Sequence, residues 1–153
     1  VSLSARTTQL KPSGEWRGKS AGVTAMTEVT GFGLLGHLIE MAEGSGLSAE
    51  ISYVALPVGE GVKEYLSQRI IPDATYRNWN GYSSRTGFEK GVNVMEAFNL
   101  LPDPQTNGGL LIAVDGSAVE EVKNLLKTNG LERFAEPIGR FMTAGEKTVA
   151  VKI

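Results

Sequence analysis

The sequence predicts an α+β fold in which helices pack on a mixed, mostly antiparallel sheet. Apolar residues recur at helical spacing over 34–42 and 119–126, whereas short apolar runs or alternations typical of strands occupy 109–114 and 148–153. Glycines and prolines separate these stretches. Interspersed helices and non-parallel strands are typical of a layered domain, and 153 residues suffice for one domain with its own core.

The first third predicts a strand and a helix after a polar lead-in. Residues 1–20 are interpreted as a linker or lead-in segment, ahead of a domain that covers 21–153. Residues 23–29 mix β-branched and small side chains, which favours a strand. Thr30 then predicts the cap of a helix, which the glycines at 44 and 46 end.

The middle of the chain predicts less regular structure. Residues 47–54 alternate apolar and polar side chains like a half-buried strand, and 57–68 predict a helix that begins with a proline. Residues 72–92 are rich in glycine, serine, asparagine and aromatic residues, so we expect a long ordered loop with room for one short strand. A short helix over 93–101 should end at Pro102.

The last third gives the clearest signals. The apolar run 109–114 predicts a buried strand, and Ser117 predicts the cap of a helix that Gly130 ends. Strands are predicted at 135–142 and 148–153, with an Ala-Gly turn between them. We expect both long helices to lie against one sheet, in a single core.

Composition excludes several classes of protein. The net charge is -2 without a long basic run, so we expect no nucleic-acid partner. The chain has no cysteine, which excludes a disulfide framework or thiolate site within it and fits a cytoplasmic protein. No apolar stretch is long enough to span a bilayer, so no membrane partner is expected.

The stretch T-E-V-T-G-F-G-L-L-G-H, from Thr27 to His37, is the strongest candidate site. A strand leads through Gly31 and Gly33 into a helix start, where unpaired N–H groups and the helix dipole suit a phosphate. Glu28 would place a carboxylate beside it, the kind of ligand that Mg²⁺ prefers. On the residues alone, a tight turn with a solvated glutamate explains the pattern as well, because a lone Gly-x-Gly is weak.

A second stretch, L-P-D-P-Q-T-N-G-G-L-L at 101–111, precedes a predicted buried strand. Two prolines stiffen it, and a Gly-Gly pair lets the backbone pack closely. Asp103, Gln105 and Thr106 then place polar groups in a rigid turn. Taken alone, this stretch is explained by a structural turn with hydrogen bonds to its own backbone.

Together the two stretches resemble selenophosphate synthetases (selenide, water dikinases), whose patterns are T-D-V-T-G-F-G-L-L-G-H and D-P-Q-T-S-G-G-L-L. Between them, I-P-D-A-T-Y-R-N at 71–78 resembles that family's P-G-G-T-x-R-N. The resemblance runs over 22–142. The sequence departs from the family where Glu28 replaces an aspartate, Asn107 replaces a serine and residues 73–74 replace a glycine pair.

This resemblance implies an enzyme that makes selenophosphate from selenide, ATP and water, with AMP and phosphate as products. The family belongs to a superfamily related to aminoimidazole ribonucleotide synthetase, and its members are homodimers of two-domain subunits. The chain would be the C-terminal domain, which helps to close the nucleotide and Mg²⁺ site and is inactive without the N-terminal catalytic domain. It would supply no catalytic residue. The residues implied on the nucleotide or phosphate side are Thr27, Thr30, Gly31, Gly33, Asn78, Gln105 and Thr106, with Glu28 as a Mg²⁺ ligand.

Alternative interpretations remain open. The chain could be a stand-alone module that binds a nucleotide or a partner, or half of another enzyme of the superfamily, such as thiamine-monophosphate kinase. His37 lies inside the predicted helix, which favours packing or a hydrogen bond over catalysis. The start at Val1 suggests an excised half, whose exposed face should then include 27–32 and 103–107, with 72–92 mobile.

Overall fold

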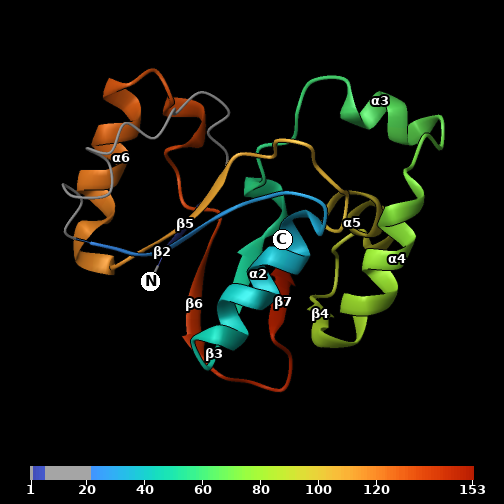
Figure 1. The fold of residues 1–153 in the computed structure, drawn as a ribbon, viewed down its shortest axis with the longest axis horizontal. Coiled ribbons are helices and arrows are strands. Elements are labelled where there is room, and N and C mark those ends of the chain that lie inside the picture. The colour runs from blue at the N-terminus through green and yellow to red at the C-terminus, as the bar shows by residue number, and fades with distance from the viewer. Residues whose placement is uncertain (1, 6–21) are drawn as a thin grey trace.

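The computed structural model describes residues 2–5 and 22–153. In this part of the chain, the strands form one seven-stranded sheet in the order β2-β5-β1-β6-β3-β7-β4 (Figure 1). Pairing is antiparallel from β2 through to β3, whereas β7 runs parallel to both β3 and β4. The observed fold is therefore the α+β arrangement with a mixed, mostly antiparallel sheet that the sequence predicts.

The strand bounds show one difference from the sequence interpretation. The strands are β1 Ser2–Ala5, β2 Val23–Glu28, β3 Leu47–Ser52, β4 Thr86–Phe88, β5 Leu110–Val114, β6 Gly139–Thr143 and β7 Val149–Lys152. Although residues 1–20 were expected to be a linker, β1 lies inside the sheet between β5 and β6. A four-residue strand has too few side chains to produce a pattern. The rest of the predicted linker lies outside the described residues.

Five α-helices occupy the described residues, and none of them is long and apolar enough to cross a membrane. They are α2 Gly33–Gly44, α3 Val62–Ser67, α4 Asp73–Tyr82, α5 Val94–Leu100 and α6 Val119–Thr128. Short 3₁₀ turns are formed by Tyr53–Ala55, Ser83–Arg85, Gly116–Ala118 and Glu132–Phe134. In Figure 1, α6 lies beside β2 and β5, whereas α3, α4 and α5 gather at the opposite end of the molecule.

The prediction of a long loop at 72–92 is wrong. Helix α4 occupies half of that segment and begins directly after Pro72, which is extended, with φ of -62° and ψ of 142°. The composition of α4 gives little helical signal, because asparagine, glycine and aromatic residues are weak helix formers. Tertiary contacts stabilise it instead: Thr75 is fully buried, and the ring of Trp79 meets the ring of Phe98 edge-on, 5.2 Å between centroids. The mobility expected of this segment stays a prediction.

Several predicted helix starts are also displaced. Helix α3 begins at Val62 rather than at Pro57, after Gly61 in a left-handed conformation with φ of 76°. The residue directly before α2 is Phe32, whereas Thr30 was predicted to cap this helix. Before α6, the Asp115 carboxylate caps the 3₁₀ turn Gly116–Ala118 in place of the predicted Ser117, and Ala118, directly before the helix, makes no side-chain cap. Capping depends on local backbone angles, which short sequence patterns specify poorly.

Helices α2 and α6 cover opposite faces of this sheet. The alternation of side chains along β5 separates them: Leu111 packs in the cluster that contains Leu35 of α2, whereas Ile112 packs in the cluster that contains Val122 and Leu126 of α6. The prediction of a single sheet beneath both helices is confirmed. The prediction of a single core is wrong, because successive residues of a strand point to opposite faces.

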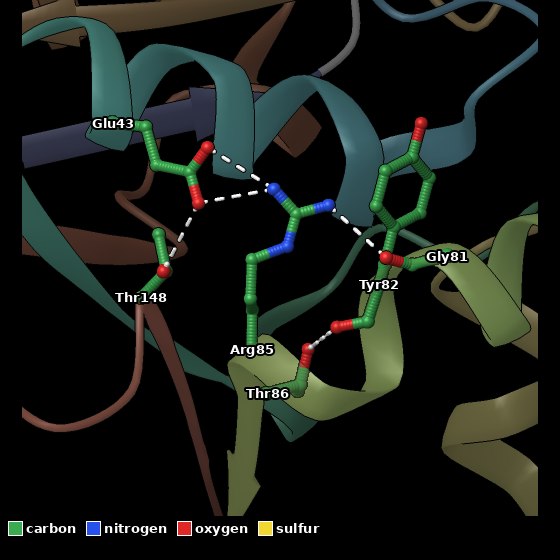
Figure 2. Close-up of polar contacts among 6 residues, drawn as sticks. All are labelled: Glu43, Gly81, Tyr82, Arg85, Thr86 and Thr148. Atoms are coloured by element: carbon green, nitrogen blue, oxygen red, sulfur yellow. Dashed lines mark hydrogen bonds and ion pairs between the residues drawn. The ribbon is translucent and has the colours of Figure 1, made fainter.

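The C-terminal end of α4 is fastened to α2 (Figure 2). Arg85 Nη1 lies 3.0 and 3.1 Å from the two carboxylate oxygens of Glu43, and its Nη2 donates to the Gly81 carbonyl over 3.0 Å. The hydroxyl of Thr86 donates to the Tyr82 carbonyl over 3.1 Å. These contacts hold the helix that carries the site residue described below.

Candidate functional site

The two motif stretches meet in space, because backbone hydrogen bonds continue the pairing of β2 with β5. The N–H of Val29 donates to the Gly109 carbonyl over 2.8 Å, and the N–H of Gly108 donates back to the Val29 carbonyl over 2.9 Å. The N–H of Gln105 donates to the Thr30 carbonyl over 3.0 Å. We call residues 29–33 the Thr30 turn and residues 101–109 the Gln105 turn. The two turns form one continuous backbone surface.

Gly33 is required where the Thr30 turn enters α2. Its φ of 68° is left-handed, and a Cβ there would lie 2.6 Å from the carbonyl carbon of Pro102 and 2.8 Å from the Asp103 carbonyl oxygen. Only glycine accommodates both the backbone angle and the close approach. The start of α2 is therefore packed directly against the Gln105 turn.

This packing uses N–H groups that the sequence predicts to be unpaired. The N–H of Gly33 donates to the Thr30 carbonyl over 3.0 Å, and the N–H of Leu35 donates to the Leu101 carbonyl over 2.9 Å. For these two groups the prediction of free donors at the helix start is wrong. The Gln105 turn accepts the N–H of Leu35, whereas the N–H of Gly33 is paired within the Thr30 turn.

His37 supports the Thr30 turn from inside α2. His37 is 7% exposed, and its Nε2 accepts the backbone N–H of Thr30 over 3.1 Å. An accepting Nε2 carries no proton, so the neutral ring carries it on Nδ1. That nitrogen lies 3.4 Å from the Glu40 carboxylate, without the alignment of a hydrogen bond. These contacts agree with the predicted packing or hydrogen-bonding role.

Asn78 joins the two turns from a third element. Its side-chain Nδ2 donates to the carbonyl of Gly31 over 2.8 Å and to the carbonyl of Pro102 over 2.9 Å. It lies on α4, within the segment predicted to be a loop. The family resemblance implies a position on the nucleotide side for this residue, whereas in the structure both hydrogens of its amide are directed to backbone carbonyls.

The predicted site residues fall into separate groups. Contacts described above bring together Thr30, Gly31, Gly33, Asn78 and Gln105. Glu28 and Thr106 are exposed.

Glu28 and Thr27 point to different faces of the sheet. In the β2–β5 register, Glu28 is paired with Leu110, which packs toward α6, whereas Thr27 is paired with Leu111 on the α2 side. Directly opposed residues share a face, so the Glu28 carboxylate projects away from the α2 side. A ligand that touched both Glu28 and the joined turns would have to reach around the end of β2.

A Mg²⁺ site does not fit the described residues alone. Within residues 2–5 and 22–153, no three histidine, cysteine, aspartate or glutamate side chains are grouped to hold a metal. Mg²⁺ requires near-octahedral oxygen coordination. Glu28 can therefore provide a single carboxylate, and further ligands would have to come from elsewhere.

A cavity of about 240 Å³ that the sequence did not predict lies beside the joined turns. Asp103 and Gln105 supply polar groups to its wall, and the Gln105 amide donates a hydrogen bond to the Asp103 carboxylate. The segment 56–62 closes another side, held in part by Arg133, which donates to the Val58 carbonyl over 2.8 Å. The remaining lining residues are Val29, Leu34, Leu100 and Leu101. A short aliphatic stretch before a helix gives no sequence signal for such a wall.

The exposed surface around the turns agrees in part with the expectation of a bare face. Phe32 is 49% exposed, as expected. Val29, in the same stretch, is only 5% exposed and belongs to the core under α2. Thr30 and Gln105 are half-buried. The face therefore combines an exposed side chain, Phe32, with half-buried and buried residues beneath it.

Comparison with known proteins assigns the family. Residues 4–152 match the family model described as AIR synthase related protein, C-terminal domain. This chain belongs to that family. The AIR synthase related C-terminal domain accounts for nearly all of the chain, including the two turns and α4.

Several relatives carry the name selenide, water dikinase. The protein from Haemophilus influenzae is 42% identical over 132 residues, which are 86% of this chain and 36% of that protein. The protein from Bordetella bronchiseptica is 42% identical over 144 residues, covering 94% of this chain and 40% of that protein. The Shigella flexneri protein is 45% identical over 132 residues, again 86% and 36%. The chain spans well under half the length of these relatives.

Proposed function

We propose that this chain acts as the C-terminal part of a selenide, water dikinase, which makes selenophosphate from selenide, ATP and water and releases AMP and phosphate. The observation that carries the proposal is the identity of 42% to 45% with proteins of that name over 86% to 94% of the chain. Because the chain matches only 36% to 40% of those relatives, the remaining machinery would lie in an N-terminal catalytic domain.

Within such an enzyme, the joined turns would form a rigid wall that helps to close the nucleotide site. Two observations support a wall rather than a phosphate-binding turn. The N–H groups of Gly33 and Leu35 donate to neighbouring carbonyls, and the side-chain amide of Asn78 also donates to backbone carbonyls. Thr30, Gly31, Gln105 and Thr106 would present the surface that faces ATP, with Thr27 at its edge.

Glu28 would contribute one carboxylate oxygen to Mg²⁺, whose other protein ligands would come from the N-terminal domain. Its exposure at the end of β2 supports this role, since a buried carboxylate would be unable to reach a metal shared with another domain. We further propose, from the family resemblance, that the complete enzyme is a cytoplasmic homodimer. The chain alone would be inactive, because it contains no cysteine and its described residues group no metal ligands.

A chimera tests the proposal. The C-terminal region of the Haemophilus influenzae enzyme that aligns with this chain, 132 residues, would be replaced by the corresponding residues of this chain. We expect the chimera to form AMP from ATP in a selenide-dependent reaction, whereas this chain alone and the truncated Haemophilus protein alone form none. A folded chimera without selenide-dependent AMP formation, or AMP formation by the chain alone, would contradict the proposal.

The cavity beside Gln105 favours a second candidate, a stand-alone module that binds a nucleotide or a partner. It lies wholly within this chain, so a ligand could occupy it without another domain. Calorimetric titration of the isolated chain with ATP separates the two candidates. Tight binding without Mg²⁺ would favour the module, and no binding would favour a wall that needs its N-terminal partner.

A further inference from the structure

We infer that Asn78 is a positioning residue, which fixes the Thr30 turn against the Gln105 turn so that both present one arrangement to a ligand. The fixing itself is argued from the geometry of this chain. Its consequence for the reaction rests on the proposed function. The inference assigns Asn78 a role through other residues rather than a contact with the nucleotide.

The chemistry of the asparagine amide suits this role. Its NH₂ group has two hydrogens in a fixed plane, and here Nδ2 lies 2.8 Å from the Gly31 oxygen and 2.9 Å from the Pro102 oxygen. One side chain thereby ties together two carbonyls that belong to different turns, 71 residues apart along the chain, from residue 31 to residue 102. Both distances are typical of well-formed N–H···O hydrogen bonds.

The same geometry argues against a phosphate contact. With both hydrogens directed to carbonyls, Asn78 would have to release one of them before it could donate to a ligand. Its remaining polar atom, Oδ1, is an acceptor, and an acceptor has no favourable contact with the oxygens of a phosphate. Asn78 therefore acts on the backbone of the turns.

The attachment comes from an independently held element. Helix α4 is tied to α2 by the Arg85–Glu43 ion pair near its C-terminal end, as Figure 2 shows. Next to Asn78, the Trp79 ring packs edge-on against Phe98, and one turn earlier Thr75 is fully buried. Because these contacts hold α4 independently of the two turns, the Asn78 amide has a defined position, and its hydrogen bonds fix both turns relative to α4.

Pro102 shows why the Gln105 turn needs this attachment. Proline has no backbone N–H, so this stretch has fewer donors with which to bind its neighbours. Its carbonyl, buried beside the start of α2, receives the Asn78 amide instead. Backbone hydrogen bonds join the two turns near Val29 and Thr30 and at the start of α2. The Asn78 amide adds a contact at Gly31 and Pro102, between those points.

Amide hydrogen exchange on this chain tests the positioning directly. In Asn78→Ala, we expect the N–H groups of Gln105 and Leu35, which bond across the two turns, to exchange about tenfold faster, because each of the two lost hydrogen bonds is worth roughly a factor of three. The N–H of Ser52, bonded to the Ile138 carbonyl in the sheet, should exchange at the unchanged rate. Asn80→Ala, an exposed asparagine on the same helix, is the matched control and should alter neither.

Each result decides the inference. Unchanged exchange at Gln105 and Leu35 would overturn it, and so would equal acceleration at Ser52, since that would show general destabilisation. If Asn78→Ala does not fold, Asn78→Gln, which keeps the NH₂ group on a longer side chain, must show the same local pattern in milder form. The inference would also be overturned if, in Asn78→Gln, the exchange rates of Gln105 and Leu35 changed no more than that of Ser52.

The chimera then tests the consequence for the reaction. We expect Asn78→Ala to raise KM for ATP by about fivefold to tenfold and to lower kcat by less, because only part of the population holds the binding arrangement. Unchanged kinetics beside locally faster exchange would remove the link to the nucleotide. An inactive unmutated chimera would count against the proposed function, while the exchange experiment would still decide the positioning role.

Discussion

The backbone N–H of Thr30 donates a hydrogen bond to Nε2 of His37 over 3.1 Å, and the Thr30 hydroxyl lies 3.2 Å from the same nitrogen. The first of these contacts satisfies a backbone donor that the turn into α2 would otherwise leave without a partner. A histidine inside a helix thus supports the residue that precedes the helix by three positions. The resulting constraint acts on the same turn that Asn78 holds from the other side.

Removal of the His37 acceptor should destabilise the chain. His37→Phe keeps a ring beside Phe32, 5.7 Å away between centroids, but leaves the Thr30 N–H unpaired. We expect the free energy of unfolding to fall by about 1–3 kcal/mol, the cost of a half-buried donor without a partner. Urea denaturation followed by circular dichroism measures the change.

The matched control is Glu40→Gln, which removes the exposed carboxylate next to Nδ1. Contacts of an exposed carboxylate contribute little, so the change should stay below about 0.5 kcal/mol. A larger loss in Glu40→Gln than in His37→Phe would show that the contact with Glu40, rather than the Thr30 bond, is the role of His37.

Two glycines of the same motif should respond differently to alanine. Gly33→Ala places a Cβ 2.6 Å from the Pro102 backbone at a φ of 68°, and we expect a loss of at least about 2 kcal/mol. At Gly31 a Cβ meets nothing within 4 Å, so Gly31→Ala should change stability by less than about 0.5 kcal/mol. Thermal denaturation of both variants compares them. Similar midpoints would mean that α2 does not start against the Gln105 turn.

The sequence predicted the elements whose signal is local and repeated. Helix α6 shows helical spacing in Val122 and Leu126, and β5 shows a continuous apolar run, so both were found at nearly the observed bounds. The family was predicted as well, because the resemblance rests on short sequence patterns rather than on tertiary contacts.

Other features depend on contacts that a linear pattern does not contain. Helix α4 is stabilised by Thr75 and Trp79 in tertiary packing, against its own weak helical propensity. Strand β1 depends on two neighbours for its pairing. The two hydrogen bonds of the Asn78 amide were missed for the same reason, because their acceptors, the carbonyls of Gly31 and Pro102, are far away in sequence.

The cap before α6 provides a pH-dependent prediction. The hydroxyl of Ser117 donates to the Asp115 carboxylate over 2.6 Å, and the backbone N–H of Ser117 donates over 2.9 Å. These bonds favour the charged form and hold the pKa of Asp115 below its usual range. Asp115→Ala should lower the thermal midpoint at pH 7, and Ser117→Ala should lower it less, because the backbone bond remains.

The sign of the pH effect follows from the lowered pKa. The contribution of Asp115 is present above about pH 4, the usual range of an unfolded aspartate, and is lost as the pH falls through the lower folded pKa. The difference in midpoint between the unmutated chain and Asp115→Ala should therefore shrink in acid. A difference that grew below pH 4 would show that the cap does not depend on the charged carboxylate.

Glu28 offers the sharpest test of the proposed metal role, because its exposure separates function from folding. In the chimera, Glu28→Gln should reduce selenide-dependent AMP formation while the free energy of unfolding changes by less than about 0.5 kcal/mol. Glu28→Ala should resemble Glu28→Gln, whereas Glu28→Asp, which restores the residue of the family pattern, should retain or raise activity. Glu146→Gln, another exposed glutamate, is the control and should leave activity unchanged.

Metal titration completes this test, because loss of a Mg²⁺ ligand should change the Mg²⁺ concentration that the reaction requires. If the carboxylate contributes an oxygen to Mg²⁺, Glu28→Gln should need a higher Mg²⁺ concentration for half-maximal activity, and Glu146→Gln should not. An equal loss of activity at every Mg²⁺ concentration would place Glu28 outside the metal shell. The carboxylate projects from the α6 side of β2, so that result would favour contact with the N-terminal domain on that face.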